Sequence, residues 1–331
     1  MTDLLRVENL VTRLRSDGGE FAAVDGISLR VGPGEAVALV GESGCGKSMT
    51  ALSLMRLTPT VARLDPGSEI HFDGRNLATC SERQMQALRG SRIAMIFQDP
   101  MTFLNPVIRI GDQIAEGIRL HRKLNRRAAA EVALQALQRV RIPAPEAVLG
   151  YFPHQLSGGM RQRVLIAMAI ACEPDLLIAD EPTTALDVTI QAQIMLLLGT
   201  LRRELGSAML LITHDLGLVA EHCDRVYVMY AGQIVEEGSV FDIFEAPQHP
   251  YTRALLQSSL SIDHRVESFQ TIEGQPPSLA RPPSGCRFHP RCPVAIAACR
   301  RERPTLVKAG DGVRARCLLV GADAGAQRGQ A

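Results

Sequence analysis

The sequence lacks the long apolar runs, the strong net charge and the basic leader that would point to a membrane span, a nucleic acid or secretion. Its longest apolar runs, such as Val164 to Cys172, reach about half of the roughly 20 residues that a membrane-spanning helix needs. The net charge is only +1, so composition gives no electrostatic argument for DNA binding. No apolar stretch with a cleavage site follows Met1, so we expect no secretory signal and a reducing compartment. Any role at a membrane therefore requires a partner.

The composition is that of a globular protein with more than one domain. Hydrophobic residues make up 46% of the 331 residues and charged residues 21%. This length exceeds the usual size of one domain, so we expect a core domain with a smaller appendage. In a reducing compartment the eight cysteines are better interpreted as core thiols or metal ligands than as disulfides.

Apolar periodicity predicts an α/β chain that changes character along its length. Residues 98 to 155 are rich in Ala, Arg, Gln and Leu at helical spacing and predict a small helical subdomain, followed by a helix over 161–171. Four prolines between Gln275 and Gly285 indicate a linker or an extended wrapping segment, and the end of the chain is expected to fray. Strands are predicted at Leu4 to Leu14, Ala22 to Val31, Ala36 to Val40, Leu176 to Ala179, Met209 to Thr213 and Arg225 to Met229.

A glycine-rich loop directly after the predicted strand at Ala36 to Val40 carries the clearest chemistry. Its residues fit the pattern of Gly, four residues and Gly-Lys-Ser that binds nucleotide phosphates. Glycines let successive backbone N–H groups face the phosphates, Lys47 reaches the β and γ phosphates, and the Ser48 hydroxyl binds Mg²⁺. The loop and the first helical position after it are Gly41, Glu42, Ser43, Gly44, Cys45, Gly46, Lys47, Ser48 and Met49.

Two acids end the apolar strand predicted at Leu176 to Ala179. Asp180 suits a partner of Mg²⁺, and Glu181 can polarise a water in line with the γ phosphate. Taken alone, the pair could also cap the next helix. A second glycine-rich segment, Leu156 to Gln162, lies between the phosphate loop and these acids and would open a helix with bare N–H groups that favour an anion.

In order along the chain, these elements resemble the ATPase subunit of ATP-binding cassette (ABC) transporters over residues 4 to 260. The resemblance implies a P-loop NTPase fold with a RecA-like parallel-sheet core, an antiparallel β subdomain and a helical subdomain at about 99–170, together spanning 1–260. A small Cys-containing C-terminal domain at 261–320 and a flexible tail at 321–331 would follow. The matching pieces are the Gly41 to Ser48 loop, Gln98, Leu156 to Gln162, Asp180-Glu181, Ala185-Leu186-Asp187 and His214.

The same resemblance implies roles for these residues in ATP hydrolysis. Two ATPase chains would form a head-to-tail dimer in which Ser157, Gly158 and Gly159 of one chain complete the ATP site of the other, with Asp187 beside them. Glu181 would be the general base, His214 would contact the γ phosphate, and Gln98 would couple the Mg²⁺ site, made with Ser48 and Asp180, to the membrane subunits. Many such ATPases stack adenine on an aromatic residue before the loop. Leu14 occupies that register here, so Phe21 is assigned as the substitute.

Longer strings resemble the dipeptide and oligopeptide importer branch. They are Gln98 to Pro106, Pro153 to Arg163, His249-Pro250-Tyr251-Thr252 and Gly285 to Pro293. The resemblance implies an ATPase that drives peptide uptake from the cytoplasmic face of the membrane. Its partners would be a related but distinct ATPase, two transmembrane permease subunits and an extracytoplasmic solute-binding protein. Nickel importers share these strings, so nickel or another small solute is an alternative.

Four cysteines gather near the end of the chain, at Cys286, Cys292, Cys299 and Cys317. Their separations match neither the common zinc knuckle nor the usual ferredoxin spacings. Four thiolates in a unit with little core of its own would suit a [4Fe-4S] cluster or a zinc ion, and free thiols held for packing are the third possibility. The resemblance favours the cluster. Cys45 lies instead beside a predicted helix N-terminus, a setting that predicts a lowered thiol pKa.

A soluble ABC ATPase acting on nucleic acid is the competing function. Such proteins tend to carry long coiled coils or inserted domains, whereas only 57 residues separate Gln98 from Leu156 and no sustained heptads appear. The basic run from Arg119 to Arg127 has no interleaved aromatic residues to stack on bases, so a solvated helix face is the better interpretation. We therefore expect no nucleic-acid partner.

Overall fold

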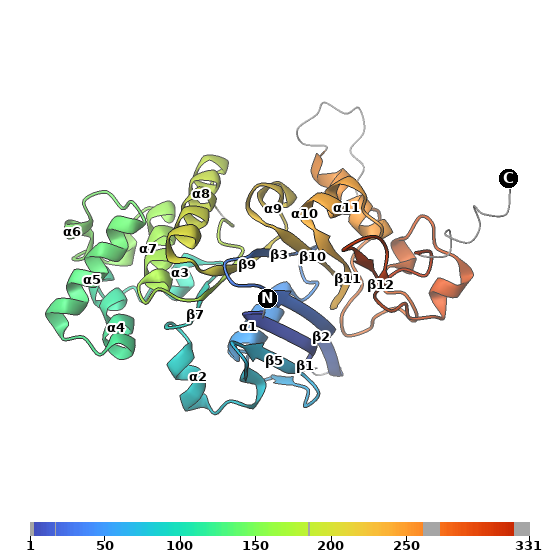
Figure 1. The fold of residues 1–331 in the computed structure, drawn as a ribbon, viewed down its shortest axis with the longest axis horizontal. Coiled ribbons are helices and arrows are strands. Elements are labelled where there is room, and N and C mark those ends of the chain that lie inside the picture. Colours follow the sequence, from blue (N-terminus) through green and yellow to red (C-terminus); the bar gives the residue numbers. More distant parts are fainter. Residues whose placement is uncertain (1–2, 17, 185, 261–271, 321–331) are drawn as a thin grey trace. The chain divides into compact units, whose positions relative to one another are not determined.

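The computed structural model describes residues 3–16, 18–184, 186–260 and 272–320. The chain forms two compact units, each assembled from segments that are distant in sequence (Figure 1). The first unit comprises Met1–Leu4, Val31–Glu35 and Thr79–Leu211, and the second comprises Leu5–Arg30, Ala36–Ala78 and Ile212–Ala331. The tail predicted at 321–331, the residues 261–271 and Ala185 lie outside the described residues.

Helices form most of the first unit and occupy the region predicted to be helical. Helix α4 packs on α5, and both pack on α7. The side chain of Asn125 caps α5 by accepting a hydrogen bond from the N–H of Ala128, and Ala129, Ala133 and Leu137 bury one face of this helix. The helices are α2 (Glu82–Leu88), α3 (Pro100–Phe103), α4 (Ile110–Arg122), α5 (Arg126–Arg139), α6 (Pro145–Val148), α7 (Gly158–Ile170) and α8 (Val188–Leu205), with a 3-10 turn at Pro153–Gln155.

The strands of the first unit confirm two of the sequence predictions. They are β7 (Ile93–Ile96), β8 (Leu176–Asp180) and β9 (Ala208–Thr213), in the order β9-β8-β7, and the last two residues of β9 belong to the second unit. Strands β7 and β8 are parallel, with Ile93 paired to Leu176. All of β8 is buried, as expected for a continuous apolar run in a sheet covered on both faces. The acidic end of β8 is thus fixed by a strand that cannot slip without exposing its apolar residues.

An antiparallel sheet forms one part of the second unit. Its order is β2-β1-β5-β6, and β4 also pairs with β1. Buried Leu5, Val7 and Leu10 give β1 an inner face, which confirms the strand predicted there. The strands are β1 (Leu5–Ser16), β2 (Gly19–Val31), β4 (Ala62–Leu64), β5 (Glu69–Phe72) and β6 (Arg75–Asn76), and a 3-10 turn follows at Leu77–Thr79.

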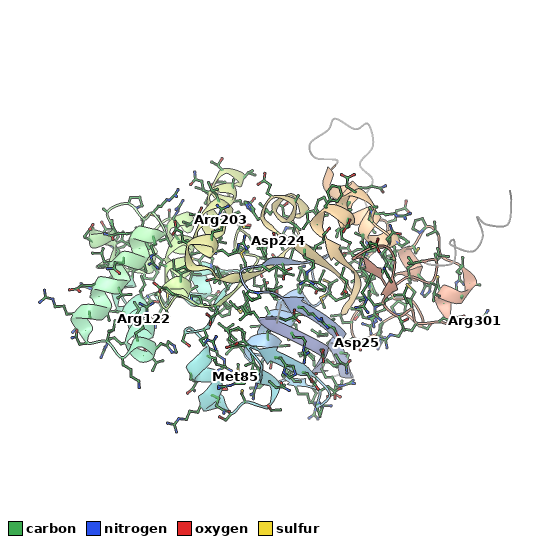
Figure 2. All side chains as sticks on the ribbon, in the orientation of Figure 1. Asp25, Met85, Arg122, Arg203, Asp224 and Arg301 are labelled. Carbon is green, nitrogen blue, oxygen red and sulfur yellow. The ribbon has the colours of Figure 1, made fainter. Side chains whose placement is uncertain are left out.

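The rest of the second unit combines the strand before the phosphate loop with the C-terminal part of the chain. Strands β3 and β10 are parallel, β10 and β11 are antiparallel, and β13 and β12 continue beyond β11. Asp224, labelled in Figure 2, fixes the start of β3 because its carboxylate accepts a hydrogen bond from the N–H of Ala36. The elements are β3 (Ala36–Val40), α1 (Lys47–Met55), α9 (Leu216–His222), β10 (Arg225–Tyr230), β11 (Gln233–Ser239), α10 (Val240–Glu245), α11 (Pro250–Leu260), 3-10 turns at His289–Arg291 and Ala297–Arg300, β12 (Val307–Lys308) and β13 (Arg314–Ala315).

The C-terminal region shares a hydrophobic core with the strands of the second unit. Phe288 and Val313 are buried in one cluster with Val40, Tyr230 and Tyr251. The rings of Tyr230, Tyr251 and Phe288 contact one another at centroid distances of 4.6 to 5.4 Å. Throughout the described ranges, no helix is both long enough and apolar enough to cross a bilayer.

Candidate functional site

The phosphate loop connects β3 to α1 and has a backbone that only glycine tolerates at two positions. Gly41 has φ 152°, and a Cβ there would lie 2.1 Å from the carbonyl oxygen of Met229. Gly46 has φ 112°, and its Cβ would lie 2.5 Å from the carbonyl oxygen of Ala23. The loop is therefore pressed against neighbouring backbone, which leaves its remaining N–H groups in a fixed arrangement.

Lys47 and Ser48 open helix α1 at the end of this loop. The buried Lys47 ammonium donates hydrogen bonds to the carbonyl oxygens of Gly41, at 2.7 Å, and Glu42, at 3.1 Å. The first turn of α1 contains no acidic residue, so nothing there offsets the partial positive charge of the helix N-terminus. Lysine, serine hydroxyl and helix N-terminus together make a site for an anion such as phosphate.

The structure contradicts the lowered thiol pKa predicted for Cys45. Its side chain is 4% exposed. Burial raises the pKa of this thiol to about 11, although Lys47 nearby opposes the shift. The predicted lowering by the helix terminus is therefore wrong, because loss of water around the thiolate outweighs the favourable charge.

Glu42 ties the phosphate loop to the C-terminal region, a contact that sequence reasoning missed. The N–H of Glu42 donates to the hydroxyl of Tyr251 at 2.9 Å. Its carboxylate accepts two hydrogen bonds from the guanidinium of Arg291, at 2.7 and 3.0 Å. The bonds to this carboxylate raise the pKa of Arg291 above its ordinary value. Glu42 and Arg291 are 249 residues apart, so no local pattern could have indicated the pair.

His214 also belongs to the second unit, in the turn between β9 and α9. The side chain of Asp215 accepts hydrogen bonds from the N–H groups of Gly217 and Leu218 and so caps α9. The N–H of Asp215 donates to the Thr213 hydroxyl. This tight turn presents His214 on the surface, with its side chain exposed.

In the first unit the structure brings Gln98 and Glu181 together. The Gln98 amide nitrogen donates to Oε2 of Glu181 at 2.9 Å, and the Thr184 hydroxyl donates to the same oxygen at 2.9 Å. Glu181 follows the buried Asp180 directly and has φ 45°, an unusual conformation for a residue with a side chain. Such strain is typical of functional sites. Thr184 was not predicted, although a hydroxyl three residues after an acid is the signal that could have found it.

The second glycine-rich segment forms an exposed helix N-terminus in the first unit. The Ser157 hydroxyl caps α7 by accepting from the N–H of Met160, and Ser157 and Gly158 are exposed. A Cβ on Gly159 would lie 3.1 Å from Ile190 of α8, so this position favours glycine. Asp187 in turn caps α8 through the N–H of Ile190. Ser157 and Asp187 are thus caps of two adjacent helices.

Phe21 and Leu14 line a cavity of about 520 Å³ in the second unit. Ser43 and Gly44 of the phosphate loop share this lining with Gln275–Ala280. The predicted adenine-stacking residue therefore lies beside the loop that would hold the phosphates of the same nucleotide.

The four late cysteines lie close enough to influence one another's ionisation. Burial raises the pKa of Cys286, Cys292 and Cys317, and charge repulsion from neighbouring thiolates adds to each shift. The N–H of Cys286 donates to the carbonyl oxygen of Cys299 at 2.9 Å. Among the described residues, however, no three His, Cys, Asp or Glu side chains are arranged to hold a metal ion. The geometry thus does not support the predicted cluster or its zinc alternative.

Comparison with known proteins matches two family models. The model for the ABC transporter matches residues 24–184, and the model for the oligopeptide/dipeptide transporter C-terminal region matches residues 235–299. A probable peptide ABC transporter ATP-binding protein, y4tR of Sinorhizobium fredii, is 53% identical over 95% of this chain and 94% of that protein. The dipeptide transport ATP-binding protein DppD of Bacillus subtilis is 47% identical over 96% and 95%, respectively.

Solved structures give the same fold. The ATP-binding cassette MJ0796, in a dimeric post-hydrolysis state with ADP and Pi, is 26% identical, with a TM-score of 0.63 over 71% of this chain and 98% of that one. The cbiO1 protein of Clostridium perfringens, part of the cbiONQ transporter complex, is 28% identical, with a TM-score of 0.62 over 74% and 92%.

Proposed function

The chain belongs to the ABC transporter family of ATPases, and from this membership we propose that it hydrolyses ATP to drive uptake of dipeptides or oligopeptides. One observation carries the peptide assignment. Relatives named for peptide or dipeptide transport match along about 95% of the chain, including the C-terminal region. ATPases for other solutes with only the shared cassette would not match this region.

We assign the phosphate chemistry to the loop and the acids described above. Lys47 neutralises charge on the β and γ phosphates, and the N–H groups opening α1 bind their oxygens. Mg²⁺, when bound, would supply further charge neutralisation, and we propose Ser48, Asp180 and Gln98 as the residues that would offer it the hard oxygen ligands it prefers. Because the Gln98 nitrogen is engaged by Glu181, its amide oxygen is the atom left for the metal.

Glu181 is the proposed general base. The two hydrogen bonds from Gln98 and Thr184 fix one carboxylate oxygen and so limit the orientations that the group can adopt. His214 is proposed to hydrogen-bond the γ phosphate. Ser157, Gly158, Gly159 and Asp187 are proposed to serve the ATP of a partner ATPase, an assignment that fits the exposure of the α7 N-terminus.

The proposed partners are a related ATPase, two transmembrane permeases and a solute-binding protein outside the membrane, which places this chain at the cytoplasmic face. Three exposed apolar residues near Gln98 support a permease contact: Met101, Phe103 and Val107. An exposed apolar group of this kind is typical of an interface. These three residues also follow closely in sequence the glutamine that contacts the proposed base, so binding of a permease there would influence hydrolysis.

Glu181→Gln in the assembled importer tests the mechanism. We expect ATP binding to persist while ATP turnover and uptake of a labelled dipeptide stop. Glu173→Gln is the matched control, because Glu173 also has a positive φ, at 55°, and accepts a hydrogen bond from Arg139. Normal turnover in Glu181→Gln would refute the base assignment. Uptake of Ni²⁺ but not of dipeptides by the unaltered importer would refute the peptide assignment.

The four late cysteines are proposed as ligands of a [4Fe-4S] cluster, with zinc as the alternative. The support is that the four thiols lie close enough to affect one another's ionisation, although no three of them are arranged to hold a metal ion among the described residues, and no step of the ATPase mechanism depends on the metal. Anaerobic purification followed by counts of iron, sulfide and zinc per chain decides between them. A colourless protein that contains none of the three would end this proposal.

A further inference from the structure

The cavity beside the phosphate loop has walls from opposite ends of the chain. Leu14 and Phe21 come from β1 and β2, and the residues from Gln275 to Ala280 come from the proline-rich segment. Gly44 of the loop has open space at the position of a Cβ, with nothing within 4 Å. A ligand whose phosphates occupy the loop could therefore extend from Gly44 into this cavity.

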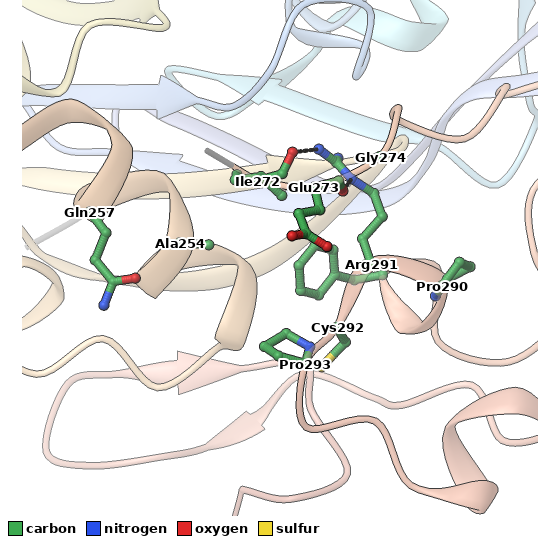
Figure 3. A pocket seen from close by; sticks show the side chains of 10 residues that line it. Ala254, Gln257, Ile272, Glu273, Gly274, Pro290, Arg291, Cys292 and Pro293 are labelled. Carbon is green, nitrogen blue, oxygen red and sulfur yellow. Dashed lines mark hydrogen bonds between the residues drawn. The ribbon is translucent and has the colours of Figure 1, made fainter. Parts of the chain in front are cut away.

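Arg291 holds the proline-rich segment in place. Its guanidinium donates hydrogen bonds to the carbonyl oxygens of Ile272, at 3.2 Å, and Glu273, at 3.0 Å, just before the segment begins (Figure 3). The same guanidinium binds the carboxylate of Glu42 in the loop. One buried cation thus fixes the start of the segment and the loop relative to each other, and half-buried Leu279 packs on the core of the same unit.

We propose that Gln275–Ala280 forms one wall of the site for the nucleotide base, with Phe21 and Leu14 as the facing wall. The inference rests on the proposed ATPase function, which requires a nucleotide with its phosphates in the adjacent loop. Two prolines, two leucines and a phenylalanine offer flat or apolar surfaces to a planar base. The size of the cavity, about 520 Å³, lies within the range of small-molecule sites. Arg291 is the positioning residue that fastens this wall to the loop.

Ligands with and without a base distinguish this wall from a purely structural segment. Binding of ATP and of tripolyphosphate to the full-length chain is measured by calorimetry. Ala280→Trp, at an exposed lining position, fills the cavity. We expect it to weaken ATP binding by about tenfold and leave tripolyphosphate binding unchanged. The indole would occupy the space of the base and so remove the contact of the base with Phe21, and stacking of a base on an aromatic group is worth roughly that factor. Phe21→Ala should show the same selective loss.

Arg281→Trp is the matched control, because Arg281 is the next residue, is exposed and does not line the cavity. It should bind both ligands as the unaltered chain does. The proposal is overturned if Ala280→Trp binds ATP normally, if it loses both ligands equally, or if Arg281→Trp loses ATP to the same extent. In each of these cases ATP binding by the unaltered chain would leave the ATPase function standing. Failure of the unaltered chain to bind ATP would instead refute that function.

Discussion

The pair formed by Arg291 and Glu42 should contribute far more to stability than a surface pair of the same geometry. The Arg291 side chain is 5% exposed and that of Glu42 is 23% exposed. Removing one partner of a buried ion pair leaves the other charge without compensation and costs about 3 to 5 kcal/mol. Because Glu42 retains some contact with water, we expect Arg291→Ala to lower the free energy of unfolding by the lower end of this range, about 3 kcal/mol.

The pair of Arg63 and Glu20 is the matched control. Its two hydrogen bonds, at 2.8 and 3.0 Å, closely resemble those of the buried pair, at 2.7 and 3.0 Å. Its side chains are 56% and 40% exposed, so water and salt screen the attraction. Burial is therefore the main difference between the two pairs.

Double-mutant cycles by chemical denaturation, followed by circular dichroism, measure the coupling in each pair. The cycles combine Arg291→Ala with Glu42→Gln, and Arg63→Ala with Glu20→Gln. We expect a coupling of about 2 kcal/mol in the first cycle, allowing for hydrogen bonds of Arg291 to other partners, and a much smaller value in the second. Equal couplings in the two cycles would refute the reasoning from burial.

Three further predictions follow from single side chains. Cys45 should resist iodoacetamide at pH 7 in the folded chain and react in denaturant, because a pKa of about 11 leaves only about one thiol in 10,000 as thiolate. Rapid labelling of the folded protein, measured by peptide mass spectrometry, would contradict this. Burial lowers the pKa of His249 from 6.5 to about 3, so only the unfolded chain takes up this proton as pH falls below 6.5. Between pH 6.5 and 5.0 the free energy of unfolding should therefore fall by about 1.6 kcal/mol more than in His249→Asn, and parallel pH profiles from denaturation would exclude this effect. Ser157→Arg should leave ATP binding to the isolated chain unchanged in calorimetry but reduce ATPase activity of the assembled importer, whereas weakened binding to the isolated chain would argue against a role at the partner's ATP.

The sequence predicted best those elements whose signal is local. Strands β3 and β8 are continuous apolar runs, and a buried parallel strand is the structure that such runs favour. Helix α8 was not predicted, although Asp187 before it and Gly206 after it are recognisable caps. The apolar residues between these caps extend over nearly the whole helix, which obscures its helical period.

Contacts between distant segments were beyond the reach of sequence patterns. The partners of Glu42 lie 209 and 249 residues away, and nothing near Glu42 in the sequence indicates them. The prediction of the Cys45 thiol pKa failed for a related reason. Its neighbours in sequence suggest a stabilised thiolate, whereas its exclusion from water depends on residues brought together by the fold.

The aromatic contacts of Phe288 have a consequence for how short this ATPase can be made. Phe288 is 1% exposed and packs against Tyr230 and Tyr251, whose hydroxyl also holds the phosphate loop through Glu42. A chain ending at Leu260 would lose this ring, uncover two tyrosines and deprive Glu42 of its guanidinium partner. The minimal stable nucleotide-binding fragment of this protein therefore extends well beyond its cassette motifs and includes the cysteine-bearing end.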